Sequence, residues 1–409
     1  MSPLRFKCRS IALSIVRHET ALLAQLQTTC RCKLLDQYFA LTANLGTHLF
    51  YMFFLPLFYW NNASKLGNEV LCGLAFGVYF TGAIKDWLCL PRPLSPPVHR
   101  ISMSGSACLE YGFPSTHSCN VATVALVFMN RYGSHYNWYL AWLFLTIVFG
   151  RLYTGMHGIL DVTCGALMGV AVYKIDMAIL QFMIPAEGQS MIPSVVLGGL
   201  ICSLMIIFHP VPVDNCPCFD DSVAFIAVMW GILVWGNLYR AYVGVLVAPA
   251  NAWMSGLRFV VGAAVIVVWR IISKKTMLAV LPPVLRGLQK CGLSLPRDNY
   301  IPASQYDKPT NVVEETIIDS PKEFKKTISH IARSRGRSDS VGPQSEADYY
   351  EAMDVYTNAP ASEQGPPMPE QIAPRRRRYD AEVITKLVVY SGISAVVFVS
   401  MCLFAVLGI

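Results

Sequence analysis

The sequence predicts an all-α fold, a polytopic transmembrane helix bundle. Of its 409 residues, 54% are hydrophobic and only 14% are charged, whereas a soluble domain carries about 25% charged residues. The apolar residues also gather into stretches of about 17–25 residues, the length that a helix needs to cross a bilayer. Together, these two observations favour one integral membrane domain over several soluble domains.

Eight to nine membrane spans are expected from the apolar stretches. They fall at 38–60, 68–88, 118–136, 138–153, 158–183, 193–209, 222–242, 256–273 and 383–408. A further apolar segment, Thr276–Leu288, contains Pro282 and Pro283. Because proline removes a helix hydrogen bond and clashes with the preceding turn, this segment is expected to be re-entrant or to lie on the surface.

Polar segments divide the chain into four parts. Residues 1–35 are a basic segment, whose mildly amphipathic stretch Ile11–Leu26 fits either a helix on the membrane surface or a disordered arm. Residues 36–289 form the main transmembrane domain, and residues 383–408 a C-terminal transmembrane helix. Between them, residues 290–382 are rich in Ser, Pro, Glu, Lys and Arg. This tail has no apolar period that could build a core, so disorder is expected.

Composition also narrows the classes of partner. The formal net charge of +7 is modest, and the aromatic residues lie in apolar spans instead of basic clusters, so nucleic acid is not an expected partner. The 13 cysteines are scattered. One pair, Cys216 and Cys218, has no second pair nearby, which does not favour a zinc site. In an oxidising compartment, one of the two is a candidate for a disulfide.

Charged and imidazole side chains interrupt the apolar pattern at three places. Charge near a bilayer is costly and therefore marks function. Cations can hold phosphate oxygens, while one imidazole attacks phosphorus and a second donates a proton. This combination predicts phosphoryl transfer without a metal or cofactor. The residues concerned are Lys85, Arg92, His117, Arg151, His157 and Asp161.

The spacing of His157 and Asp161 suggests a nucleophile and its orienting group. Residues at i and i+4 share a face of a helix. The carboxylate could then accept a hydrogen bond from one ring nitrogen and leave the other nitrogen free to attack. Gly155 and Gly158 flank the histidine and leave room for a substrate. The alternative for this pair alone is an ordinary His–Asp contact at a membrane interface.

The other two motifs lie at expected span ends. Pro91 and Pro93 should end a helix before Arg92, so that Lys85 and Arg92 converge through a turn; the alternative is that both cations extend towards lipid headgroups. Residues 114–117 read Pro-Ser-Thr-His. Ser115 or Thr116 could cap the next helix, whose free N–H groups would seat a phosphate. The alternative is a capping serine beside an interfacial histidine. Two crossings separate His117 from His157, which places both on one side.

In combination, these motifs resemble the type 2 phosphatidic acid phosphatase superfamily. That family has Lys-x6-Arg-Pro, then Pro-Ser-x-His, then Ser-Arg-x5-His-x3-Asp, and residues 85–161 match in order and spacing. Gly150 stands where the family usually has serine. The stretches 90–98, 110–118 and 150–158 are similar to the sphingosine-1-phosphate phosphatase branch, and 209–225 is similar to its fungal members.

The resemblance implies an enzyme whose phosphatase site lies at helix ends within the 36–289 domain. Its substrate would be a sphingoid long-chain base 1-phosphate taken from the bilayer. His157 would form a phosphohistidine, Asp161 would orient it, and His117 would act as general acid and base. No metal is implied. The residues expected to hold the phosphate are Lys85, Arg92, Ser115, Thr116 and Arg151.

Two indications of membrane orientation disagree. The basic N-terminus and tail fall on the same side as the motifs, which by the positive-inside rule is the cytosol. The resemblance instead implies the endoplasmic reticulum membrane with a lumenal site. We follow the resemblance, because long segments obey the charge rule poorly. The sequon at Asn62 is expected on the opposite side from the site.

Three other functions stay open from the sequence alone. One is a broader lipid phosphatase that acts on phosphatidate or isoprenoid diphosphates. Another is an anion or lipid transporter, although no paired hydrophobic halves are visible. The third is a catalytically dead lipid-binding relative, although every core residue of the motifs is present.

Overall fold

A computed structural model describes residues 3–95, 97–102, 110–183, 191–212, 216–244, 249, 251–293, 300–305 and 378–409. Most of the expected 290–382 tail therefore lies outside the described residues. The regular secondary structure of the described part is helical apart from one parallel pair of two-residue strands, which confirms the predicted all-α class.

The elements in chain order are α1 (Pro3–Cys30), α2 (Lys33–Thr42), η1 (Ala43–Gly46), α3 (His48–Trp60), α4 (Ser64–Leu88), α5 (Thr116–Tyr132), η2 (Gly133–Tyr136), α6 (Asn137–Tyr153), α7 (Ile159–Met183), α8 (Ile192–Ile207), α9 (Cys218–Tyr242), α10 (Ala252–Lys290), β1 (Tyr300–Ile301), η3 (Ala303–Gln305), β2 (Arg378–Tyr379) and α13 (Asp380–Leu407).

Five described helices are long and apolar enough to cross a membrane: α4, α7, α9, α10 and α13. The bent pair formed by α2 with η1 and by α3, which turns by 57°, would make a sixth span. Helices α5 and α6 have 17 residues each and α8 has 16, which is short for a full crossing. A membrane protein is thus confirmed, while the count of eight to nine spans stays a prediction.

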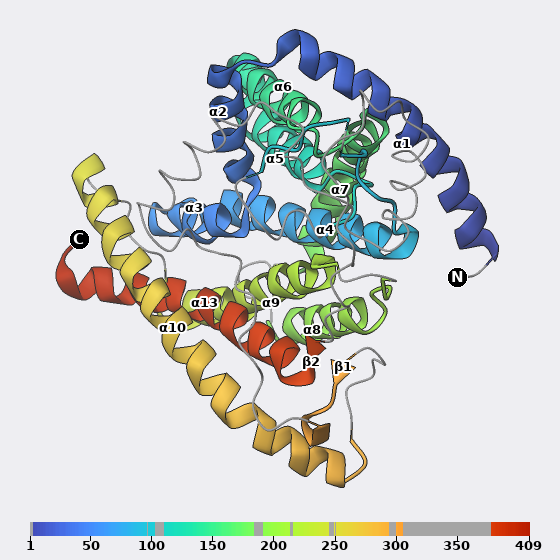
Figure 1. The fold of residues 1–409 in the computed structure, drawn as a ribbon. Helices are drawn as coiled ribbons and strands as arrows, with labels where there is room; N and C mark the ends of the chain where they lie inside the picture. The colour runs from blue at the N-terminus through green and yellow to red at the C-terminus, as the bar shows by residue number, and fades with distance from the viewer. Residues whose placement is uncertain are drawn as a thin grey trace.

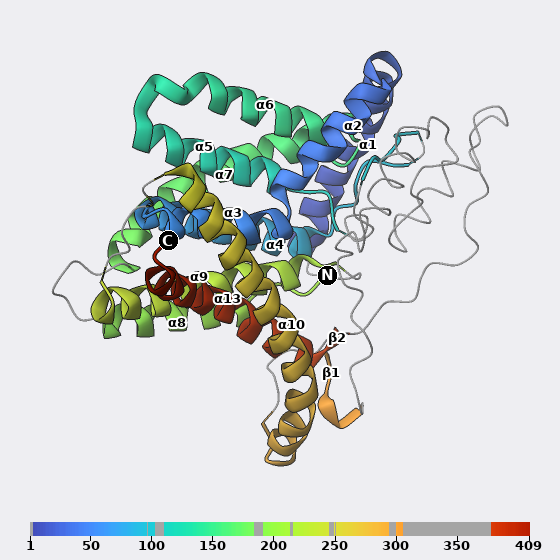
Figure 2. The same cartoon turned by 90° about the vertical axis from the view of Figure 1, so that its left-hand side faces the viewer.

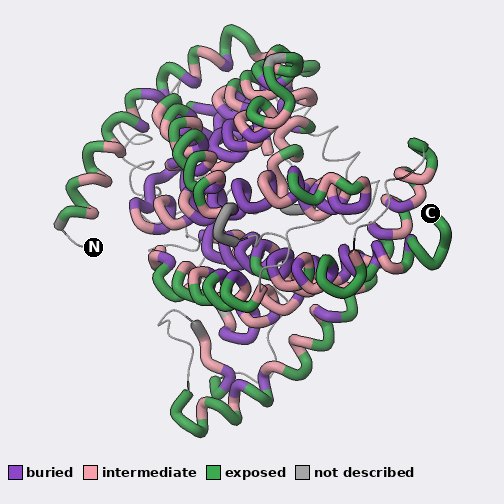
Figure 3. Tube along the Cα trace, turned by 180° about the vertical axis from the view of Figure 1, so that it is seen from behind, coloured by how far each residue is buried: buried purple, intermediate pink, exposed green. Residues whose placement is uncertain are grey.

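Helix α4 lies at the centre of the bundle, where it packs against α5, α7 and α9 (Figure 1). Helix α9 in turn packs against α8 and α13, and α10 runs along the outside of α13. In α4, 72% of the apolar stretch is buried inside the protein, and in α9 67% is buried. In α10 the buried share of the apolar stretch is only 17%. Figure 3 shows this gradient from the buried centre to the exposed outer helices.

Helix α10 corrects one expectation. It continues without a break from Ala252 to Lys290, through Pro282 and Pro283, where a re-entrant or surface segment was expected. Two prolines remove only two backbone donors, and tertiary contacts hold the following turns in place. Leu285 packs against Ala303 and Ala381, beside the strand pair at that end of α10.

Helix α1 settles the alternatives for the N-terminal segment. It is a 28-residue helix that lies against α4, α6 and α7 and not a disordered arm (Figures 1 and 2). Three of its arginines donate hydrogen bonds to backbone carbonyls: Arg5 to Asp86 at 3.0 Å, Arg9 to Cys89 at 3.3 Å, and Arg17 to Arg92 at 3.3 Å. These arginines therefore hold α1 against the rest of the protein, in addition to contributing positive charge.

Candidate active site

The end of α4 presents Lys85 and turns the chain back towards it. Cys89 closes the helix with a left-handed backbone conformation, φ 52°, and the prolines that follow cannot extend a helix. Arg92 consequently points inward, where its NH1 donates to the Met156 carbonyl at 2.6 Å. Both cations are buried, with exposed fractions of 1% for Lys85 and 2% for Arg92.

The start of α5 carries the second motif. Ser115 is the N-cap of α5 and accepts a hydrogen bond from the Ser118 N–H at 3.3 Å. The sequence alone leaves the cap open between Ser115 and Thr116. The Ser115 N–H donates to the Asp161 carbonyl at 3.0 Å, which joins this motif to the third. Thr116 accepts a hydrogen bond from the Lys85 ammonium at 2.8 Å and so holds that cation in the site.

Two glycines of α7 allow the second and third motifs to meet. A Cβ at Gly165 would lie 2.4 Å from the Ser115 carbonyl oxygen, and a Cβ at Gly169 would lie 2.5 Å from that of Cys119. Both neighbours are backbone atoms and cannot rotate away. This small-x-x-x-small spacing brings two helix backbones together closely. The N-termini of α5 and α7 are thereby held side by side at one end of the bundle.

His157 is held in one tautomer by a backbone carbonyl. Its Nδ1 lies 2.9 Å from the Gly112 oxygen. A carbonyl can only accept, so Nδ1 carries the proton and Nε2 keeps a lone pair. Nε2 lies 3.3 Å from NH1 of Arg92. Burial and the charges of Arg92, Lys85 and Arg151 hold the pKa of His157 well below its usual value, which keeps the imidazole neutral.

Asp161 does not make the direct hydrogen bond that the spacing suggested. His157 precedes α7 instead of lying on it, and its Nδ1 is 3.6 Å from Oδ2 of Asp161. The same carboxylate oxygen accepts the Gly158 N–H at 2.8 Å. Asp161 therefore fixes the turn that carries His157 and lies beside the ring without a direct hydrogen bond to it.

The remaining predicted residues lie at the same end. The ring of His117 packs against Gly46, where an added Cβ would come within 2.3 Å of it, and a positive charge on His117 would lower the pKa of His157. Arg151 is buried, and its positive charge acts on both His157 and His117. The structure brings together all eight residues that the sequence predicted.

Glu110 was missed by the sequence motifs, although it lies in the site. Its carboxylate forms ion pairs with Lys85 and, at 3.1 Å, with Arg92, and its carbonyl accepts the Arg92 Nε–H at 2.8 Å. Burial raises the pKa of this carboxyl, but the two cations outweigh burial and lower it to about 2. The signal in the sequence was a lone acid seven residues before His117, which no spacing rule marks as special.

Glu19 of α1 was missed as well. Its Oε1 accepts the Leu160 N–H at 2.9 Å, and a Cβ on Gly158 would lie 2.1 Å from its Oε2. Since Gly158 precedes α7 and has no side chain, Glu19 supplies the N-terminal cap of that helix from a distant segment. Burial raises the pKa of Glu19, opposed by the Leu160 and Ile159 N–H groups.

Gly150, where a serine is usual, has a packing explanation. A Cβ at this position would lie 2.8 Å from Cδ1 of Phe39, a residue of α2. Phe39 also packs with Tyr153. The missing side chain therefore lets α2 lie directly on α6 behind Arg151.

Comparison with known proteins shows the family to which this chain belongs. Residues 67–182 match the PAP2 superfamily model, a range that contains all three motifs. A dihydrosphingosine 1-phosphate phosphatase of Schizosaccharomyces pombe is 33% identical over 407 residues, covering 95% of this chain and 88% of the relative. The chain belongs to the PAP2 superfamily.

Other relatives of this PAP2 protein carry related names. A dihydrosphingosine 1-phosphate phosphatase of Saccharomyces cerevisiae is 36% identical over 305 residues, or 70% of this chain and 74% of the relative. The human sphingosine-1-phosphate phosphatase 2 is 34% identical over 137 residues, or 32% of this chain and 34% of the relative. No solved structure matches the chain.

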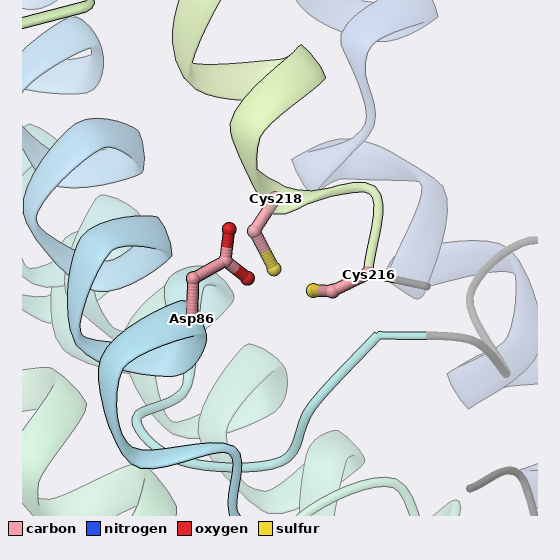
Figure 4. A group of neighbouring side chains, drawn as sticks. All are labelled: Asp86, Cys216 and Cys218. Carbon is pink, nitrogen blue, oxygen red and sulfur yellow. The ribbon is translucent and has the colours of Figure 1, made fainter. Parts of the chain in front are cut away.

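One cluster of this PAP2 chain has donor atoms suited to a metal. Asp86, Cys216 and Cys218 are buried, and their ligand atoms lie within 4.8 Å of one another (Figure 4). The imidazole of His209 contacts Asp86 at 3.7 Å but also Ser222 at 3.1 Å. Within the described residues the cluster offers three donors, whereas structural zinc takes four. Both cysteines are thiols there and form no disulfide with another described cysteine.

Proposed function

We propose that this chain hydrolyses sphingoid long-chain base 1-phosphates to the free base and phosphate. The enzyme class, a phosphoric monoester hydrolase, follows from the PAP2 family and from phosphatase relatives that cover most of the chain. The observation that carries the mechanism is the orientation of His157. Its Nε2 is unprotonated and faces Arg92 amid three buried cations.

Binding of the phosphoryl group uses groups that converge at the ends of α4, α5 and α6. Lys85, Arg92 and Arg151 supply positive charge, and Ser115 with the backbone of Thr116 supplies donors at a helix N-terminus. The alkyl chain of the substrate stays in the hydrocarbon while its headgroup reaches these helix ends. Three fixed cations supply the charge stabilisation that the transferring phosphoryl group requires.

The first chemical step is attack on phosphorus by Nε2 of His157. His117 takes up a proton as the phosphate dianion binds beside it, because a nearby anion favours the charged imidazole. A P–N bond then forms as the ester P–O bond breaks, and the departing lipid oxygen takes that proton from His117. The Gly112 carbonyl keeps hold of the Nδ1 proton, while the charge of Asp161 stabilises the positive charge that develops on the ring. The products of this step are the free sphingoid base and a phosphohistidine.

The second step returns the enzyme to its starting state. His117, now neutral, takes a proton from a water molecule, and the hydroxide formed attacks phosphorus. The P–N bond breaks and the electron pair returns to Nε2 of His157, so that phosphate leaves the cation cradle. A general acid and base of this kind contributes about 100- to 10,000-fold to the rate.

The location proposed for this activity is the endoplasmic reticulum membrane with the site towards the lumen. Residues 36–289 would form the phosphatase domain, joined by the C-terminal helix, which packs on α9 and α10. The positive-inside rule would place the basic N-terminus, and with it the site, in the cytosol. The hydrogen bonds of Arg5, Arg9 and Arg17 weaken that argument, because these cations have a structural role. Asn62 precedes α4 at the end opposite Lys85, so glycosylation at Asn62 would contradict a lumenal site.

The decisive experiment measures phosphate release from a panel of lipids by the purified chain in detergent. Dihydrosphingosine 1-phosphate, phosphatidate and an isoprenoid diphosphate separate the proposed substrate class from broader alternatives. His157→Ala should abolish turnover, whereas the control His135→Ala, at an exposed position in η2, should not change it. Unchanged turnover of His157→Ala would refute the nucleophile, and loss of activity in EDTA would refute the metal-free mechanism.

A further inference from the structure

The phosphate cradle, by which we mean the three cations Lys85, Arg92 and Arg151 proposed to bind the phosphoryl group, already contains a carboxylate. Glu110 forms ion pairs with both Lys85 and Arg92, the cations that a phosphoryl group would engage. A carboxylate is unfavourable in a site that binds only an anion. It repels the phosphate and occupies the cationic donors that the phosphate would use. Its presence needs a reason in the chemistry of the substrate.

Arrival of the phosphate changes the surroundings of Glu110. Once the donors of Lys85 and Arg92 turn to the phosphoryl oxygens, the carboxylate loses its two direct partners. An anion left without a partner in a largely buried site is costly. A substrate that brings its own cation next to its phosphate would remove that cost.

A sphingoid base phosphate has this arrangement of charges. Its ammonium group is on the second carbon from the ester oxygen, so the cation lies beside the phosphate within one headgroup. We propose that Glu110 is the subsite for this ammonium group and selects lipid phosphates that carry a free amine. This inference rests on the proposed function and adds a residue that recognises the substrate.

The burial of the three side chains fits this arrangement. The Glu110 side chain is 21% exposed, compared with 1% for Lys85 and 2% for Arg92. The carboxylate thus lies towards the open side of the cradle and the cations lie towards its floor. A headgroup that enters with its phosphate on the cations leaves its ammonium on the side of Glu110. The carboxyl is ionised at neutral pH, since its pKa is about 2.

A matched pair of substrates tests the subsite. Dihydrosphingosine 1-phosphate and its N-acetyl derivative share the phosphate and the chain, but only the first carries an ammonium group. Glu110→Gln should lower kcat/KM for the free amine about tenfold or more, the usual loss for a hydrogen bond to a charged group, mainly through KM. The same variant should leave kcat/KM for the N-acetyl substrate unchanged or raised. Glu110→Asp, which keeps the charge, should retain part of the preference.

A control variant distinguishes recognition of the ammonium group from a structural role of Glu110. Glu69→Gln removes a carboxylate that pairs with Arg131 outside the site, and it should not alter the ratio between the substrates. An equal loss or an equal gain for both substrates in Glu110→Gln would overturn the subsite, since it would show a structural or a merely blocking role. If the wild-type chain hydrolyses neither substrate, the proposed function fails; if it hydrolyses both and the ratio is unchanged in Glu110→Gln, only the subsite fails.

Discussion

The backbone oxygen of Gly112 accepts a hydrogen bond from the Nδ1–H of His157 at 2.9 Å, and so takes the role that sequence spacing gave to Asp161. A carbonyl fixes the tautomer as firmly as a carboxylate does, but it carries no full charge. The two functions of an orienting group are therefore divided. Gly112 determines which nitrogen is free, and Asp161, at 3.6 Å from the ring, holds the turn. The electrostatic part of the role is what we propose for the Asp161 carboxylate.

Asp161→Asn should therefore reduce the rate without abolishing it. Asparagine keeps an oxygen that can accept the Gly158 N–H, and Gly112 still fixes the tautomer, so only the charge is lost. We expect kcat to fall about 10- to 100-fold, equivalent to about 1.4–2.7 kcal/mol. Single-turnover phosphate release measures this step. Activity as low as that of His157→Ala would show that the carboxylate itself orients the ring.

Glu19→Ala should weaken the start of α7 from a segment far away in the chain. Loss of the acceptor leaves the Leu160 N–H without its cap, which typically costs about 1 kcal/mol. We expect a lower melting temperature in detergent together with a lower kcat, because His157 lies just before this helix. Glu19→Gln keeps an acceptor and should recover most of the stability. Gln25→Ala, on the exposed side of α1, is the control, and an equal effect there would refute the capping role.

Gly165→Ala should separate α5 from α7. The added methyl group would lie 2.4 Å from the Ser115 carbonyl, and overpacking of this kind costs about 1–3 kcal/mol. Both stability and kcat should fall, since Ser115 and His117 move relative to His157. Gly256→Ala is the matched control because a Cβ there meets nothing within 4 Å. It should be neutral or stabilise the exposed helix by about 0.5–1 kcal/mol. Equal behaviour of the two variants would show that close packing does not position the site.

That the residues of the proposed catalytic cluster lie close together could be predicted from the sequence, because their type and spacing follow a recognisable pattern. Lys85, Arg92, His117 and Arg151 are costly near a membrane and follow a regular order along the chain. Glu110 and Glu19 could not be found this way. Each acts through a contact across many residues, and such contacts depend on how the helices pack and not on local spacing.

The fold shows the same division between local pattern and packing. Apolar stretches predicted the helices, and Pro91 and Pro93 predicted that α4 ends before Arg92. Local rules failed at α10, where Pro282 and Pro283 lie within a continuous helix because contacts beyond them hold the next turns. They also left the N-terminal segment undecided, since its binding to the site depends on carbonyl groups that only the folded chain presents.

The ion pairs of Glu110 lead to a prediction about stability and pH. The pKa of this carboxyl falls from its ordinary value of 4.5 to about 2 in the folded chain, so folding favours the ionised form. A lowered carboxyl pKa stabilises the fold at pH values above the unfolded pKa, and this contribution is lost as the pH falls towards the folded pKa. Wild-type chain should therefore lose stability relative to Glu110→Gln between about pH 4.5 and pH 2.

Thermal unfolding in detergent across a pH series measures this difference. The gap in melting temperature between wild type and Glu110→Gln should be constant from about pH 8 to pH 5.5, because the carboxyl is ionised in both folded and unfolded chains there. Below about pH 4.5 the gap should narrow steadily. A gap that stays constant down to about pH 3 would mean that Lys85 and Arg92 do not hold Glu110 in the ionised state.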